Sequence, residues 1–223
     1  MNFFHTPLRW SYALSRRLGM IDVTGLYQLT ADRLIDGTVP TGYTIRTISP
    51  AELSDLIAGG MVHPQVGAAV HWDKPGRRLV AAFAESRMVS FTGLATQFVA
   101  GSDNYSRAIH LGTSIDLPAG TLFVYNAWTD PDHRGKRLLA ALIRWAISNQ
   151  IDGAPLDTAR SLATMIDCAN TASCRAFEKL GMQRLGWVVR MGRGPIQISL
   201  LPASASQAGL RVAADAPGIR IAL

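Results

Sequence analysis

A basic turn follows an apolar strand near the middle of the chain, and its residues could bind an anion. Residues 122–128 (LFVYNAW) form a predicted buried strand, and an amphipathic helix begins near Leu138. The amides of a helix's first turn have no intrahelical acceptors, and the helix dipole favours anions there. Arg134, Lys136 and Arg137 bring three cations to this helix start. The pattern predicts a site for a phosphate-bearing ligand.

Taken alone, the Arg-Gly-Lys turn is equally compatible with a solvated helix start whose cations only keep the surface soluble. A second strand-to-helix passage over residues 163–185 (ATMIDCANTASCRAFEKLGMQRL) favours the ligand site. Asn170 is placed to cap the start of its helix. Gly181 follows Leu180 at the end, where glycine is the usual left-handed cap.

The two passages together resemble a known family. Arg134-Gly135-Lys136, followed by Asn170-x-x-Ser173-x-x-x-Phe177-Glu178-Lys179-Leu180-Gly181-Met182, is similar to the two signature motifs of the GNAT superfamily of acyl-CoA-dependent N-acyltransferases. The resemblance covers roughly residues 43–191. It implies an α/β (α+β) fold with a mixed central sheet that is splayed between its two central strands and flanked by helices.

The resemblance also implies where the acyl-CoA cosubstrate, most simply acetyl-CoA, would bind. The pantetheine arm would pair with the end of the apolar strand at Ala127, Trp128 and Thr129. The pyrophosphate would lie on the turn and helix start, at Arg134, Gly135, Lys136, Arg137, Leu138 and Leu139. Asn170 would lie near the phosphates or adenosine, or would only cap its own helix. No metal is implied.

Three residues depart from the family's pattern. Arg137 stands where the family usually has Gly, and Leu139 stands where it has Gly or Ala. Helical dihedrals do not require glycine, so we expect both residues to keep the amides in place with their side chains turned away. Phe177 occupies the position of a tyrosine that often protonates the departing thiolate. That acid is therefore missing, replaced by another group, or supplied by water.

The implied reaction is direct attack of an amine on an acyl thioester, without a covalent enzyme intermediate. It needs a donor for the developing oxyanion, such as the backbone amide of Thr129, and a group that accepts the amine's proton. No carboxylate is an evident base. Tyr125 and Asn126 are the candidate catalytic residues, because either could order a water at the end of the strand. Strand alternation equally allows Tyr125 to point into the core.

Composition sets wider bounds. The 223 residues are 48% hydrophobic and contain no internal repeat, which suits one sizeable core. We divide the chain into an N-terminal extension (1–42), a GNAT-like domain (43–200) and a C-terminal tail (201–223). No stretch is long and apolar enough for a membrane span, and no signal-peptide pattern is present, which favours a cytoplasmic protein. Cys168 and Cys174 have neither redox nor metal spacing and are expected to be core thiols.

The net charge of +6 suggests anionic partners. Arg9, Arg16 and Arg17 share the first twenty residues with seven apolar ones: Phe3, Phe4, Leu8, Trp10, Tyr12, Leu14 and Leu18. A basic amphipathic helix there could lie on anionic lipid or hold an acidic partner. It could equally pack on the domain with its arginines in water. The chain shows no nucleic-acid-binding signature, so no nucleic acid is expected as partner.

The remaining elements are predicted from local signals. Strands are expected at 25–33 and 42–48, a hairpin at 78–83 and 88–98, and further strands at 183–191 and 196–200. Ser49 should cap a helix whose buried face is Leu53, Leu56 and Ile57. Residues 100–120 form a long insertion where the acceptor could be recognised.

These observations favour an N-acyltransferase that moves an acyl group from acyl-CoA to an amine. Two alternatives stay open. One is an acyl-CoA-binding or regulatory module without turnover, which the altered turn and Phe177 suggest. The other is an assembly factor at a membrane surface, which the basic N-terminal segment suggests. The residues do not identify the acceptor amine, the length of the acyl chain or the oligomeric state.

Overall fold

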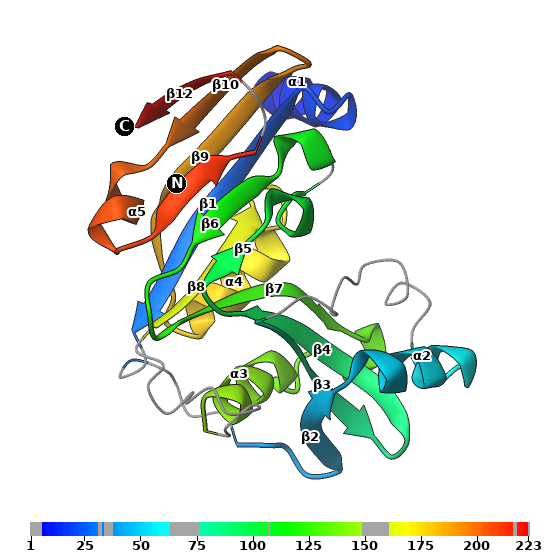
Figure 1. Cartoon of the computed structure of the whole chain (residues 1–223). Helices are drawn as coiled ribbons and strands as arrows, with labels where there is room; N and C mark the ends of the chain where they lie inside the picture. The colour runs from blue at the N-terminus through cyan, green and yellow to red at the C-terminus, as the bar shows by residue number, and fades with distance from the viewer. Residues whose placement is uncertain are drawn as a thin grey trace. The chain divides into compact units, whose positions relative to one another are not determined.

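The computed structural model describes residues 6–30, 33, 38–62, 76–106, 108–148, 161–215 and 218–222 (Figure 1). The chain divides into two compact units. Unit 1 comprises Met1–Gln28, Phe98–Pro118 and Met165–Leu223, and unit 2 comprises Leu29–Gln97 and Ala119–Thr164. The chain therefore passes between the units four times. The first and the last passages fall inside strands.

Unit 2 is built on a sheet with the strand order β8-β7-β4-β3-β2. Its strands are β2 (Tyr43–Ile48), β3 (Arg77–Ala84), β4 (Arg87–Ala95), β7 (Thr121–Thr129) and the first residues of β8 (Ser161–Asp167). Neighbours from β2 to β7 are antiparallel, whereas β7 and β8 are parallel. Most residues of β3 and β4 are buried, as in strands covered on both faces. This is a mixed sheet, as predicted.

The helices of unit 2 are α2 (Pro50–Ala58), the short η4 (Pro131–His133) and α3 (Leu138–Ser148). α3 packs on β3, β4 and β7 and buries Leu138, Ala140, Ala141, Leu142, Ile143 and Ala146. Ser49 caps α2 as predicted, because its Oγ accepts a hydrogen bond from the Glu52 amide at 3.1 Å. The predicted buried face of α2 was too wide. This nine-residue helix buries Leu53 fully and leaves Ile57 exposed.

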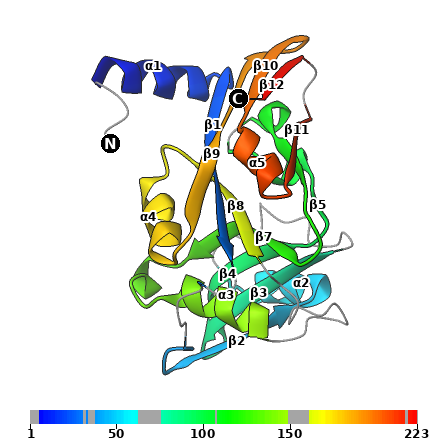
Figure 2. The same ribbon diagram turned by 90° about the vertical axis from the view of Figure 1, so that its left-hand side faces the viewer.

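Unit 1 contains two sheets. The larger has the order β12-β10-β9-β1, with β1 (Ile21–Thr30), β9 (Gln183–Arg193), β10 (Ile196–Leu201) and β12 (Ile219–Ala222). The smaller has the order β11-β6-β5, with β5 (Phe98–Val99), β6 (Thr113–Asp116) and β11 (Arg211–Ala214). The helices are α1 (Thr6–Arg17), η2 (Gly101–Asp103), η3 (Ile109–Leu111), α4 (Thr171–Lys179) and α5 (Ala203–Gln207). In unit 1, α1 and α4 lie on one side of the larger sheet, and the smaller sheet and α5 lie on the other (Figure 2).

Two rows of aliphatic side chains run across the larger sheet of unit 1. The first row pairs Ile21 with Met191, Met191 with Ile198, and Ile198 with Ile219. The second row, two residues along, is Val23, Val189, Leu200 and Ile221. All eight share one face because successive strand residues point to opposite sides. None of the eight is fully buried.

The row between them points to the other side of the sheet and is polar. It consists of Asp22, Arg190, Ser199 and Arg220, and the first three are buried. The smaller sheet lies on this side, because Arg190 Nη1 donates to Thr113 Oγ1 of β6 at 3.5 Å. The larger sheet thus buries a polar row and leaves its aliphatic rows partly open.

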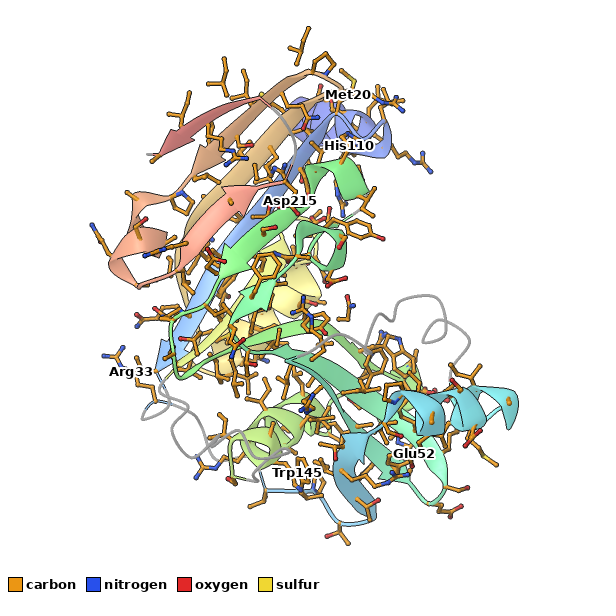
Figure 3. All side chains as sticks on the ribbon, in the orientation of Figure 1. Met20, Arg33, Glu52, His110, Trp145 and Asp215 are labelled. Carbon is orange, nitrogen blue, oxygen red and sulfur yellow. The ribbon has the colours of Figure 1, made fainter. Side chains whose placement is uncertain are left out.

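Further polar contacts join the segments on this side. Ser106 Oγ donates to Asp22 Oδ1 at 2.6 Å, and Ser114 of β6 is hydrogen-bonded to Asp215, which is labelled in Figure 3. Burial raises the pKa of Asp22, although the Ser106 hydrogen bond lowers it. Burial lowers the pKa of Arg190, although Asp215 and Asp22 raise it. In both residues burial therefore opposes the charged form more strongly than the neighbours favour it.

Helix α1 is held on unit 1 by two polar contacts. Arg16 forms an ion pair with Asp167 at the end of β8, and Cys168 Sγ donates to Tyr12 Oη at 3.3 Å. Burial is the main cause that raises the pKa of the Tyr12 hydroxyl. The N-terminal helix therefore packs on the domain, which was one of the two predicted alternatives. Phe3 and Phe4 lie outside the described residues, as do the side chains of Leu8 and Arg9.

The main predicted elements agree with the structure. The strand at 122–128 is β7, the helix from Leu138 is α3, and the helix after Asn170 is α4. β1 begins at Ile21, four residues before the predicted start, and the C-terminal tail forms α5, β11 and β12. Among the described residues, no helix is long and apolar enough to cross a bilayer. The division at residues 42 and 200 stays a prediction.

We predict that Arg190→Met stabilises the protein by about 1 kcal/mol in urea unfolding. Arg190 is 2% exposed, and its Nε and Nη2 have no hydrogen-bond partner among the described residues. A buried polar group without a partner costs free energy that an apolar side chain of similar length avoids. Arg193→Met, at an exposed position of the same strand, is the control and should change stability by less than about 0.5 kcal/mol. A clear loss of stability in Arg190→Met would show that the buried charge is compensated.

Candidate functional site

Strand β7 contains a bulge at the predicted catalytic residues. Between the pairs Phe91–Trp128 and Gly93–Tyr125, β7 has two residues, Asn126 and Ala127, where β4 has only one. Asn126 adopts a left-handed backbone conformation, with φ of +50°. Asparagine tolerates this conformation better than most residues. The bulge turns Asn126 and Ala127 outward, and both are exposed.

The parallel ladder between β7 and β8 is short. It pairs Thr121, Leu122 and Phe123 with Ser161, Leu162 and Ala163, and it goes no further among the described residues of these strands. Beyond it, the Thr164 hydroxyl donates to the Val124 carbonyl at 2.8 Å. β7 is therefore paired with β4 along one of its edges. On its other edge, only the first residues of β7 are paired with β8. This is the predicted parting of the two central strands.

Hydrogen bonds from β4 fix the end of β7. Ser90 Oγ donates to the Trp128 carbonyl at 2.9 Å and lies 2.8 Å from Thr129 Oγ1. The Asp130 amide donates to the Val89 carbonyl at 2.8 Å. In an antiparallel ladder this bond makes the preceding pair, Ser90 with Thr129, a non-hydrogen-bonded one. The backbone amide and carbonyl of Thr129 therefore point away from β4.

The turn after β7 differs from expectation at Arg137. We expected helical dihedrals there, but α3 begins one residue later and Arg137 has φ of +58°. A left-handed conformation costs a residue with a Cβ about 1 kcal/mol. Gly135 is also left-handed, with φ of +76°. Leu138 is inside the helix and buried, and Leu139 is half-buried.

The turn has the geometry of an anion site. Gly135 and Arg137 are left-handed, Arg134 is extended, and the first amides of α3, which have no intrahelical acceptors, follow directly. The Arg137 carbonyl accepts the first helical bond, from the Ala141 amide at 3.1 Å. Residues 134–137 are exposed, and a Cβ added at Gly135 would meet nothing within 4 Å. The backbone there is open to a ligand.

The three cations of the turn have different surroundings. Lys136 Nζ donates to Tyr43 Oη at 2.9 Å, and the same hydroxyl is hydrogen-bonded to His133 Nδ1 at 2.9 Å. Arg134 Nε donates to the Thr129 carbonyl at 3.2 Å, which ties the turn to the end of β7. Both side chains thus hold the turn in place as well as carrying charge. The Arg137 side chain is exposed.

The Tyr125 side chain points into unit 2. The residue is buried, and the guanidinium carbon of Arg77 lies 5.5 Å from the centre of its ring. Its neighbour Asn126 is exposed at the bulge. Of the two candidate catalytic residues, only Asn126 therefore lies on the surface of its own unit. Their catalytic roles stay predictions.

Asn170 and Phe177 lie in unit 1, whereas the other predicted site residues lie in unit 2. Asn170 caps α4, because its Oδ1 accepts from the Ser173 amide at 3.1 Å. Phe177 is buried on the same helix. Cys168 and Cys174 are free and half-buried. Within the described residues, no group of His, Cys, Asp or Glu could hold a metal ion.

Sequence reasoning missed three residues that shape the site. Tyr43 holds Lys136 from β2, and Ser90 fixes the end of β7 from β4. Arg87 pairs with the buried Asp130 at 3.4 Å at the start of the turn. All three come from strands that are distant in sequence from the turn. Only the pairing of strands in the sheet brings them near it. The sequence contains no local signal for such contacts.

No protein-family model matches the sequence, and no curated protein is similar to it in sequence. Solved structures do resemble it. A GCN5-related N-acetyltransferase from Kribbella flavida is 16% identical, with 82% of this chain and 63% of that one covered and a TM-score of 0.49.

Two further solved structures resemble the chain to a similar degree. A tandem GNAT protein from the clavulanic acid biosynthesis pathway is 15% identical, with 82% of this chain and 59% of that one covered and a TM-score of 0.48. A GCN5-related N-acetyltransferase from Sphaerobacter thermophilus is 14% identical, with 95% and 58% covered and a TM-score of 0.45. This chain spans less than two thirds of the length of each of the three proteins. At such identities the likeness concerns the fold alone.

We predict that Arg137→Gly is more stable than Arg137→Ala by about 1 kcal/mol in urea unfolding. Both variants remove the same exposed side chain and charge, so they differ only in how easily the backbone adopts φ of +58°. Equal stabilities would show that residue 137 is not left-handed. Circular dichroism spectra of the two variants should be the same.

Proposed function

We propose that this protein is an N-acyltransferase that moves an acyl group, most simply acetyl, from acyl-CoA to an amine. The observation that carries the proposal is the course of β7 in unit 2. The strand bulges at Asn126, continues beyond its ladder with β8, and leads through Arg134 into a basic left-handed turn before α3. An extended arm with a diphosphate at one end matches this edge and turn in chemistry.

The pantetheine arm would lie along β7 from the bulge to its end, at Ala127, Trp128 and Thr129. Its amide groups can add to a strand edge through main-chain hydrogen bonds. The Thr129 carbonyl points away from β4 and can accept from the arm beside Arg134 Nε, because a carbonyl oxygen has two lone pairs. Ser90 supports it by holding Thr129 from the other side at 2.8 Å.

The pyrophosphate would lie on the backbone amides of residues 135–139. Arg134 and Arg137 would add charge-assisted contacts, since both side chains are exposed. Lys136 would contribute less directly, because its ammonium already donates to Tyr43. Asn170 would act mainly as the cap of α4, with any ligand contact added to that role.

The reaction would be direct transfer. The amine nitrogen attacks the thioester carbonyl and loses its proton to a water that Asn126 would order. The C–N bond forms as the C–S bond breaks, and CoA leaves as thiolate. The Thr129 amide, which also points away from β4, would stabilise the oxyanion. The thiolate of CoA is a tolerable leaving group because thiols have a pKa near ~8.5, so water can supply its proton. A GNAT-like site that has Phe177 in place of the usual tyrosine can therefore still catalyse the transfer.

A second candidate is an acyl-CoA-binding module without turnover. Phe177 has no proton to give, and the Tyr125 side chain is buried in unit 2. Binding of acetyl-CoA without acyl transfer to a broad panel of amines, followed by mass spectrometry, would favour this candidate over the enzyme.

We predict that CoA and acetyl-CoA raise the melting temperature of the protein, because a ligand that binds only the folded form stabilises it by mass action. Arg134→Ala should weaken CoA binding about tenfold, as expected for the loss of a charge-assisted contact. Arg211→Ala, which removes an exposed arginine from β11 of unit 1, is the matched control. Calorimetry that detects no CoA binding to the wild-type protein would overturn the proposal.

We also predict that Tyr125→Phe changes kcat less than about threefold, because its hydroxyl lies in a buried part of unit 2. Loss of a true general acid would slow transfer roughly 100- to 10,000-fold. Phe177→Tyr should likewise have a modest effect, since water protonates the thiolate. A hundredfold loss in Tyr125→Phe with an unchanged melting temperature would instead identify Tyr125 as the acid.

A further inference from the structure

Helix α1 presents an apolar stripe to solvent. Trp10, Leu14 and Leu18 follow one another at intervals of four residues and are 73%, 61% and 56% exposed. Residues at this spacing share a face of a helix. Arg17 is exposed three residues after Leu14 and therefore lies beside the stripe. Soluble proteins seldom leave a Trp and two Leu open on one helix face without a binding role.

The stripe cannot simply turn inward, because the opposite face of α1 is already bound. Arg16 pairs with Asp167, and Tyr12 accepts a hydrogen bond from Cys168. Both partners belong to unit 1, as α1 does. These contacts fix which side of the helix faces the protein.

Further exposed apolar residues follow the end of α1. Met20, labelled in Figure 3, is 49% exposed, and its carbonyl accepts from the Gly192 amide at 2.8 Å. Gly192 belongs to the hairpin between β9 and β10, where Ile196 is 80% exposed and pairs with Arg193. We name the exposed residues of α1 and of this hairpin the α1 surface and define it by six residues: Trp10, Leu14, Arg17, Leu18, Arg193 and Ile196.

The elements that form the α1 surface, α1 and the hairpin of β9 and β10, contain charged side chains of one sign only. The sequence contains no Asp or Glu before Asp22, and none between Glu178 and Asp215. Asp22 itself is buried under the other face of the sheet. The elements that form the surface therefore offer only arginine as charged side chains, and Arg17 and Arg193 are exposed.

We propose that the α1 surface binds an anionic lipid bilayer. A helix with Trp and Leu on its open face and arginine beside them suits the boundary between headgroups and acyl chains. The arginines would interact with lipid phosphates while their stems lie along the apolar side chains. A second copy of the chain fits less well, because it would bring Arg17 and Arg193 against like charges. The binding is peripheral and independent of the proposed acyl transfer.

Co-sedimentation of the full chain with vesicles tests this proposal. The protein should pellet with vesicles of phosphatidylglycerol and phosphatidylcholine, bind vesicles of phosphatidylcholine alone at least tenfold more weakly, and dissociate at high salt. Leu14→Glu should weaken binding at least tenfold, because it places a carboxylate in the apolar stripe. Arg17→Glu should also weaken it, with the larger part of its effect at low salt.

Matched variants control for stability and for charge in general. Ile57→Glu introduces the same carboxylate at an exposed apolar residue of α2, and Arg211→Glu makes the same charge reversal on β11. Both should bind vesicles as the wild-type protein does. Absence of wild-type binding to the anionic vesicles at physiological salt would overturn the proposal. Light scattering that shows a wild-type dimer, and a monomer in Leu14→Glu, would also overturn it, since a second copy would then cover the α1 surface.

Discussion

The candidate site depends on one extra residue in the ladder between β4 and β7. Because two residues of β7 oppose one of β4, the strand bends at Asn126 and changes which backbone groups face β4. Downstream of the bulge, the Asp130–Val89 hydrogen bond leaves the Thr129 amide pointing to the open edge. Without the extra residue the alternation would reverse, and that amide would bond to β4. The turn that follows would then leave the strand in another direction.

Local sequence patterns were sufficient for the elements of the site. The apolar run of β7, the stripe of α3 and the cap of α4 at Asn170 are signals within about ten residues, and the structure has all three. The conformation of Arg137 was not predictable in this way. Arginine is common in helices, and only the way the turn meets α3 forces a positive φ on it. A rule based on residue type fails where tertiary structure imposes the backbone.

The contacts that complete the site were also beyond local reasoning. The Lys136–Tyr43 hydrogen bond joins residues 93 positions apart, and the Arg16–Asp167 ion pair joins residues 151 apart. Periodicity cannot indicate such pairs, because it reports only which face of an element is apolar. Periodicity also does not predict which residues of unit 1 are buried. There the polar residues Asp22, Arg190 and Ser199 are buried together with apolar ones, since the smaller sheet covers their side.

The path of the chain through the two units has a consequence for its synthesis. Unit 2 is complete once Thr164 has left the ribosome, but β1 of unit 1 has its partner β9 only after residues 183–193 are made. The first strand must therefore wait for most of the chain before it can pair, and it is without this partner in any shorter nascent chain. For the same reason no single cut in the gene yields both units as separate polypeptides.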